Sequence, residues 1–161
     1  MNHTIMKKKL HHNNVRGWLW TMIDDLYVGG EEMVRWRGGL SRTYTVSQGV
    51  RQGGILSTCL YLGYINDLLT DYEKAGVGVM IGDVNLSAPT CADDCMPLSN
   101  MSPEMQAMLG TAYSYSQEHR YSIHPGKSSV TEMINKHLTL NKDKKVWRLG
   151  EDTLNSSPLS T

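Results

Sequence analysis

The chain has 161 residues, a formal net charge of zero and 40% hydrophobic residues. This length predicts one domain with a buried core, and the zero net charge excludes a global basic field that would draw the whole chain to nucleic acid or membrane. Three cysteines (Cys59, Cys91, Cys95) are too few and too irregular for a disulfide framework or a zinc site. With no signal-peptide pattern and no apolar run of membrane-spanning length, we expect an intracellular protein without a membrane partner.

The first part of the chain is predicted to be helical. Residues 2–10 have helix-forming composition, and Asn13 and Asn14 interrupt them. Residues 15–27 carry apolar residues at helical spacing, which predicts a packed helix. Gly29-Gly30 then ends it.

Residues 33–46 change to an alternating pattern around Gly38-Gly39, which predicts a β-hairpin with a glycine turn. Its arginines, Arg35, Arg37 and Arg42, would project from one exposed surface. A solvated face is the default interpretation of such a cluster, and a phosphate-binding face needs further support.

A glycine-rich loop, SQGVRQGGILST (residues 47–58), follows. Its glycines allow close backbone approaches that side chains would block. A helix comes next, with a predicted buried stripe at Ile55, Cys59, Leu62, Ile65, Leu69 and Tyr72. A glycine loop that leads into a helix N-terminus offers N–H groups to an anion, although a plain loop-to-helix junction has the same pattern.

Short strands are predicted over residues 77–81 and 84–91, with Gly82-Asp83 as a type I′ turn signal. The stretch TCADDC then places Asp93 and Asp94 at a hairpin tip, with residues 95–98 as the return strand. Adjacent carboxylates repel each other, and a divalent cation relieves that repulsion. An Asp-Asp pair in an ordinary turn remains the alternative. Pro89 and Pro97 are expected at edges or bulges, because they cannot donate ladder hydrogen bonds.

The last third is predicted to begin with a helix that runs to about residue 120. Ser102 resembles an N-cap and Pro103 the first helical position, with a buried stripe at Met105, Met108, Leu109 and Ala112. A turn at 123–129 precedes strands at 130–134 and 145–149. We expect a domain over residues 1–150 and a polar, frayed tail over 151–161.

Taken in order, SQGVRQGGILST, CADD and HPGKS resemble the palm of a reverse transcriptase (RNA-directed DNA polymerase) from a non-LTR, LINE-type retrotransposon. KLHHNNVRGWLW, YLGYINDLL and VWRLG resemble further segments of that family, so the resemblance extends over most of the chain. It implies an α+β fold: a partial polymerase palm, with an antiparallel sheet, helices packed on one face and a fingers-side hairpin.

The resemblance also implies site residues and ligands. Asp93 would be the principal metal and catalytic ligand of the hairpin, and Asp94 would support it. Gln52, Gly53 and Gly54 would border the incoming nucleotide, and Lys127 would sit near the pyrophosphate leaving group. The implied cofactor is Mg²⁺, two ions in the complete family site, and the implied partners are an RNA template, a DNA primer and dNTP.

Departures from the family pattern bear on activity. The family's first motif ends in a pattern like Phe-Asp-x-Val-Asn-His, and Met1-Asn2-His3 resembles its last three residues. The Asp of that motif would precede Met1, so we expect the chain to be inactive alone, with weak or absent Mg²⁺ binding. Two alternatives remain open: a non-catalytic nucleic-acid-binding palm fragment, and an unrelated α+β protein whose Asp-Asp pair is an ordinary turn.

Overall fold

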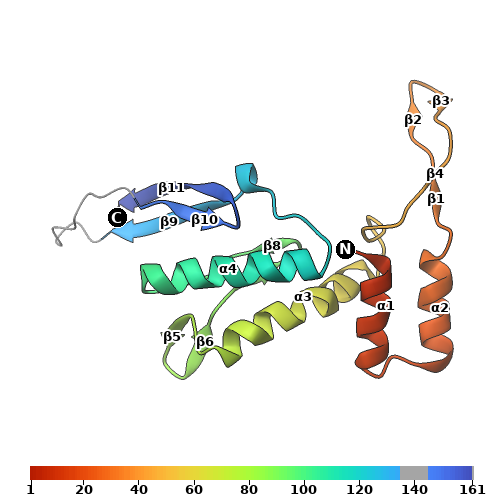
Figure 1. Ribbon diagram of the computed structural model, residues 1–161. Coiled ribbons are helices and arrows are strands. Elements are labelled where there is room, and N and C mark those ends of the chain that lie inside the picture. The colour runs from red at the N-terminus through yellow and green to blue at the C-terminus, as the bar shows by residue number, and fades with distance from the viewer. Residues whose placement is uncertain (135–144, 161) are drawn as a thin grey trace. The chain divides into compact units, whose positions relative to one another are not determined.

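A computed structural model describes residues 1–134 and 145–160 (Figure 1). The chain divides into two compact units, Met1–Asp67 and Leu68–Thr161, called here the N-terminal and C-terminal units. The helices are α1 (His3–His12), α2 (Gly17–Tyr27), α3 (Ser57–Lys74), α4 (Ser102–Glu118) and the 3-10 turn η1 (Pro125–Lys127). None of the described helices is long and apolar enough to cross a membrane.

The strands are short and pair mostly with near neighbours in the sequence. They are β1 (Glu31–Glu32), β2 (Arg35–Trp36), β3 (Gly39–Leu40), β4 (Tyr44–Thr45), β5 (Val79–Ile81), β6 (Val84–Leu86), β7 (Thr90–Cys91), β8 (Asp94–Cys95), β9 (Ser129–Ile134), β10 (Trp147–Leu149) and β11 (Asp152–Ser160). β1–β4, β2–β3, β5–β6 and β7–β8 are antiparallel pairs. The sheet β10-β11-β9 joins an antiparallel pair to a parallel one. The predicted α+β class is confirmed, and the parallel β9–β11 pairing is an addition to it.

In the N-terminal unit, α1 begins where its sequence provides a cap. The side-chain oxygen of Asn2 accepts a hydrogen bond from the Ile5 N–H at 3.2 Å, which satisfies one donor of the first turn. Asn14, at φ +61°, then reverses the chain toward α2. α2 buries Ile23 and Tyr27 but leaves Trp18 77% exposed. The predicted helix is therefore confirmed, whereas its predicted apolar face is only partly buried.

An arm of two paired ladders follows α2. β1 pairs with β4, and β2 pairs with β3 at the tip. The tip loop is Arg37-Gly38, and both residues have positive φ (+46° and +83°), as a type I′ turn requires. The predicted hairpin is thus confirmed, with its turn one residue earlier than Gly38-Gly39.

The predicted buried stripe of α3 is right at Ile65 and Tyr72 and wrong in its first half. Leu60, Tyr64, Leu68 and Tyr72 are buried at i, i+4 spacing, together with Ile65. Ile55 is 97% exposed because it precedes the helix, which begins at Ser57, and Leu62 is exposed as well. Counting the stripe from Ile55 therefore misplaced its first residues, and Cys59 is exposed too.

The C-terminal unit packs α4 against the β10-β11-β9 sheet (Figure 1). Leu109 of α4 shares a buried cluster with sheet residues, namely Val130, Trp147, Leu149 and Leu154. The Gln106 side-chain amide also donates to the Arg148 carbonyl at 2.8 Å and accepts from the Arg148 N–H at 3.0 Å. The predicted helix, including buried Met108, Leu109 and Ala112, is confirmed.

Three local predictions in this unit are corrected. Met101, not Ser102, is the N-cap of α4, and the Ser99 hydroxyl rather than a Ser102 cap binds the Met101 N–H at 3.0 Å. Gly82 alone has positive φ in the Gly82-Asp83 loop, which is the type II′ pattern rather than type I′. Residues 152–160 form β11 instead of fraying, because the Gly150-Glu151 turn returns the chain along β10.

We predict that a side chain at position 150 would destabilise that turn. Its φ is +63°, and a Cβ placed there would lie 2.3–2.8 Å from ring atoms of Tyr113. We expect Gly150→Ala to lower the free energy of unfolding by about 3 kcal/mol, from left-handed backbone strain and overpacking together. Gly110→Ala in α4 is the matched control: its Cβ meets nothing within 4 Å, so chemical denaturation should show a gain of up to about 1 kcal/mol. Equal effects of the two changes would contradict the packing described.

Because Tyr72 is buried, we predict that the folded protein loses stability at alkaline pH. It is 1% exposed and donates a hydrogen bond to the Met108 carbonyl at 2.9 Å, and burial raises the pKa of its hydroxyl above the ordinary value of about 10. Because the folded-state pKa is raised, this stability is complete below about pH 10 and is lost as pH rises further. Tyr72→Phe should cost about 1 kcal/mol at neutral pH and flatten the loss between about pH 10 and 12. Unfolding curves that keep the wild-type pH slope would contradict this.

Candidate functional site

The Asp-Asp stretch forms the tip of a β-hairpin, as the sequence predicts. Cys91 of β7 pairs with Asp94 of β8, and Ala92 and Asp93 form the two-residue loop between them. Ala92 has φ +51°, a conformation usually reserved for glycine. The turn therefore presents Asp93 at the tip and Asp94 at the first paired position, and both residues are exposed.

Two prolines, Pro89 and Pro97, flank the paired strands of this hairpin. The Met96 N–H donates to the Pro89 carbonyl at 2.9 Å, and the Leu98 N–H donates to the Ser87 carbonyl at 2.8 Å. The ladder register of β7 and β8 thus continues over residues 87–98, although Pro89 cannot return a hydrogen bond to Met96. Both prolines lie just outside the paired strands, as predicted.

Two carboxylates are the candidate metal ligands at the tip of this hairpin. No group of three or more His, Cys, Asp or Glu side chains that could hold a metal ion occurs within residues 1–134 and 145–160. The neighbouring Cys95 is half-buried, and burial raises the pKa of its thiol above the ordinary value. Asp93 and Asp94 are the two carboxylates that the tip offers, and Mg²⁺ sites commonly combine one or two carboxylates with water and substrate phosphates.

The glycine-rich loop is attached to the first residues of the N-terminal unit. The Gly49 N–H donates to the Met1 carbonyl at 2.7 Å, and Asn2 forms an antiparallel bridge with Gln48. The His3 ring nitrogen Nε2 lies 3.0 Å from the Gly49 carbonyl oxygen, and the His3 ring meets the Tyr27 ring edge-on. These contacts fix the start of the loop on α1.

The end of the loop is a tight turn that requires glycine. The Gly54 N–H donates to the Arg51 carbonyl at 3.0 Å, and the Ser57 hydroxyl donates to the same carbonyl at 2.6 Å. A Cβ on Gly54 would lie 2.6 Å from the Ser57 hydroxyl oxygen and 3.1 Å from that carbonyl oxygen. Gly53 has φ +77°, so it too occupies a backbone conformation that glycine favours.

A pocket of about 430 Å³ opens beside this loop in the N-terminal unit. Arg51 lines it, and its guanidinium donates to the Leu26 carbonyl at 3.1 Å. Gln52 lines the pocket, but Gly53 and Gly54 do not. The full lining is His3, Leu26, Tyr27, Gly30, Glu31, Glu32, Val46, Gly49, Val50, Arg51 and Gln52. Sequence reasoning gave His3 and Arg51 no role; the Asn2-His3 resemblance to the first motif was the signal that could have drawn attention to His3.

The residues predicted to form the site are divided between the two units. Gln52, Gly53 and Gly54 belong to the N-terminal unit, whereas Asp93, Asp94 and Lys127 belong to the C-terminal unit. Lys127 ends η1, where its backbone N–H donates to the His124 carbonyl at 3.0 Å and its side chain is exposed. The structure therefore brings the two aspartates together on one hairpin, and it presents the lysine on a separate turn.

The sequence profile of the reverse transcriptase (RNA-dependent DNA polymerase) family matches residues 2–151. The chain belongs to the reverse transcriptase family. The match includes the glycine loop, the Asp-Asp hairpin and Lys127, and it implies binding of a nucleic-acid template, a primer and nucleotides. A search of curated proteins found no match to this reverse transcriptase chain.

Proposed function

We propose that this chain is part of the RNA-directed DNA polymerase of a non-LTR, LINE-type retrotransposon. The observation that carries the proposal is the family match over residues 2–151, within which SQGVRQGGILST, CADD and HPGKS occur in the order expected of that type. The complete enzyme would carry out template-directed nucleotidyl transfer, using an RNA template, a DNA primer and dNTP. Two Mg²⁺ ions would stabilise the attacking and leaving oxygens of that reaction.

We assign the site residues as follows. Asp93 and Asp94 would supply oxygen ligands from the hairpin tip, which is supported by their exposure and by the two-residue loop that presents them. Gln52, Gly53 and Gly54 would border the incoming nucleotide, and the tight Gly54 turn and the pocket beside Gln52 support this. Lys127 would stabilise the charge of the leaving pyrophosphate, for which its exposed ammonium is suited.

We further propose that these 161 residues do not catalyse DNA synthesis alone. Support comes from the described residues, in which no third ligand joins the two aspartates. A site that lacks a ligand binds its metal weakly and loses orders of magnitude in rate.

Metal titration tests these assignments without relying on activity. Mn²⁺ should broaden the backbone amide NMR signals of residues 92–95 weakly, and Asp93→Asn should weaken the effect by roughly tenfold or more, because it removes a ligand. Asp83→Asn is the matched control, since Asp83 occupies the loop of the β5–β6 hairpin and has no second aspartate beside it. Primer extension on an RNA template with Mg²⁺ should give no product. Robust synthesis would refute the proposed inactivity, and equal effects of the two substitutions would refute the role of Asp93.

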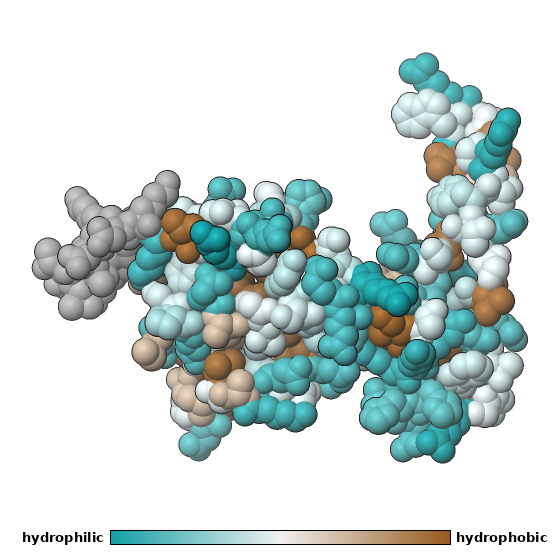
Figure 2. Space-filling model, in the orientation of Figure 1, coloured by the Kyte–Doolittle hydropathy of each residue, from teal (hydrophilic) through white to brown (hydrophobic). Residues whose placement is uncertain are grey.

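The arm formed by β1–β4 favours a second candidate function, non-catalytic nucleic-acid binding. Arg35, Arg37 and Arg42 are exposed, and the side chain of Trp36 is 73% exposed. The Arg37 guanidinium lies 6.0 Å from the centre of the Trp36 ring, so a cation and an aromatic face are offered together. In Figure 2 the arm carries hydrophilic surface with hydrophobic patches among it. Phosphates and bases are the partners that suit this combination.

Arg37→Gln tests this second function. Binding of a labelled RNA–DNA duplex should weaken severalfold, and the slope of log affinity against log salt should fall by about 0.9, because one phosphate contact is lost. Arg120→Gln is the matched control, since Arg120 is also an exposed arginine at positive φ. An unchanged salt slope in Arg37→Gln would exclude the arm as a nucleic-acid contact.

A further inference from the structure

The imidazole of His3 connects the first turn of α1 to the glycine-rich loop. His3 is buried, with 8% of its surface exposed, and its Nε2 lies 3.0 Å from the carbonyl oxygen of Gly49, 46 residues further along the chain. A carbonyl oxygen only accepts hydrogen bonds, so Nε2 carries the proton and donates it. The contact therefore requires a donor at the Nε2 position of this side chain.

The backbone at Gly49 gives this contact a large effect on the loop. Gly49 has φ +98°, and glycine adopts many other conformations at little cost, so the residue does not fix the path of the chain by itself. Because the peptide bond is planar and trans, holding the Gly49 carbonyl also directs the Val50 N–H to the opposite side. The imidazole thus sets the orientation of the peptide that leads toward Gln52.

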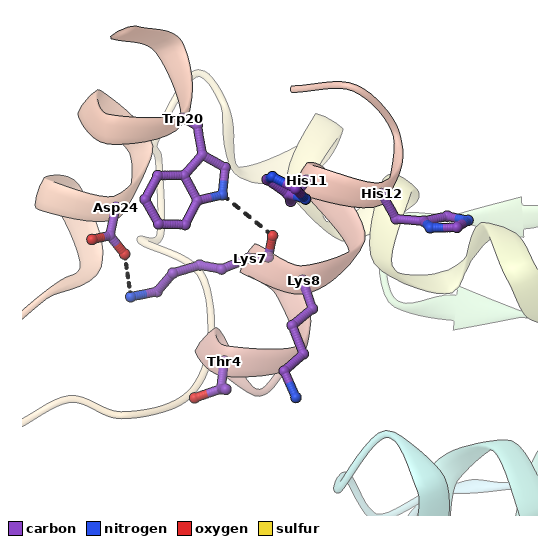
Figure 3. Close-up of a pocket in the computed structure, with 7 residues that line it drawn as sticks. All are labelled: Thr4, Lys7, Lys8, His11, His12, Trp20 and Asp24. Carbon is purple, nitrogen blue, oxygen red and sulfur yellow. Dashed lines mark hydrogen bonds and ion pairs between the residues drawn. The ribbon is translucent and has the colours of Figure 1, made fainter. Parts of the chain in front are cut away.

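Contacts with α2 hold α1 in place for this role. Lys7, one turn after His3, forms an ion pair with Asp24, and the Trp20 indole nitrogen donates to the Lys7 carbonyl at 3.4 Å (Figure 3). Both contacts lie in the α1–α2 pocket, a space of about 480 Å³ between the two helices. The His3 ring itself meets the Tyr27 ring edge-on, with 4.8 Å between their centres. The turn that carries His3 and the turn after it are therefore both attached to α2.

Packing alone does not require a histidine at this position. An apolar ring would also fill the space against Tyr27, whereas only a side chain with a donor can satisfy the Gly49 carbonyl. His3 also lines the pocket beside the loop, together with Arg51 and Gln52. The Arg51 guanidinium is in turn anchored on a carbonyl of α2. Gln52 thus follows two points at which the loop is attached, Gly49 and Arg51.

We propose that His3 is a positioning residue of the polymerase site. By holding the Gly49 carbonyl, it keeps Gln52 and the Gly53-Gly54 turn in one arrangement before an incoming nucleotide arrives. A loop that is ordered in advance saves the entropy that binding would otherwise lose, so the nucleotide binds more tightly. His3 acts through the loop and does not touch the nucleotide. This inference rests on the proposed function, in which Gln52 borders the incoming nucleotide.

His3→Asn and His3→Gln test the proposal in the full 161-residue chain. The glutamine amide places its nitrogen where His3 has Nε2, whereas the shorter asparagine amide reaches only the position of Nδ1. In His3→Asn, the N–H groups of Gly49 and Gly54 should exchange with solvent roughly fivefold faster, because one hydrogen bond that orders the loop is lost. His3→Gln should restore slow exchange. The Val28 N–H, which donates to the Asp24 carbonyl at 2.9 Å in α2, is the internal reference and should not change.

Nucleotide binding provides the second readout. In the wild-type chain, dTTP with Mg²⁺ should shift the amide NMR signals of Gln52, Gly53 and Gly54. The affinity should fall roughly fivefold in His3→Asn and be retained in His3→Gln. Faster loop exchange in His3→Asn, with no dTTP shifts even in the wild-type chain, would support the hold of His3 on the loop and refute the nucleotide contact of the proposed function instead. Unchanged loop exchange in His3→Asn, an equal rise at Val28, or no rescue by His3→Gln would overturn the proposal.

Discussion

Burial along one side of α3 is the constraint on which both units depend. Leu60 and Tyr64 contribute to the N-terminal unit, and Leu68 and Tyr72 to the C-terminal unit, all on one i, i+4 stripe. Lys9 donates to the Tyr64 carbonyl at 2.8 Å, and the Tyr72 hydroxyl donates to the Met108 carbonyl at 2.9 Å. The glycine loop ends where this helix begins, so the same helix also fixes the position of Gly54 and its turn.

Local signals in the sequence predicted much of the architecture. Helices with clear periodicity and turns with glycine were found to within a few residues, because their conformations depend on neighbours in the chain. The strand β11 was missed, although Gly150-Glu151 is a two-residue turn of the kind that joins antiparallel strands. Its parallel pairing with β9 joins residues such as Ser129 and Asn155, and no local pattern indicates that pairing.

The candidate site also contains features that neighbouring residues predict and features that depend on contacts between distant residues. The Asp93-Asp94 tip follows from a short stretch and was predicted correctly as a hairpin. His3 and Arg51 were missed because their positions depend on contacts over long sequence separations, such as His3 with Gly49 and Arg51 with Leu26. The α1–α2 pocket was missed for a related reason: three consecutive lysines look alike in the sequence, and only the packing of α2 and α3 gives each a different environment.

Pro97 has a consequence beyond the length of its strand. In the register of β7 and β8 it lies opposite Ala88, between the hydrogen-bonded pairs formed by Pro89 with Met96 and by Ser87 with Leu98. A residue at such a position directs its backbone N–H away from the partner strand, toward the free edge. Proline has no N–H, so this edge lacks a donor that an incoming strand would need. The hairpin that carries the two aspartates is thereby protected against edge-to-edge aggregation on that side.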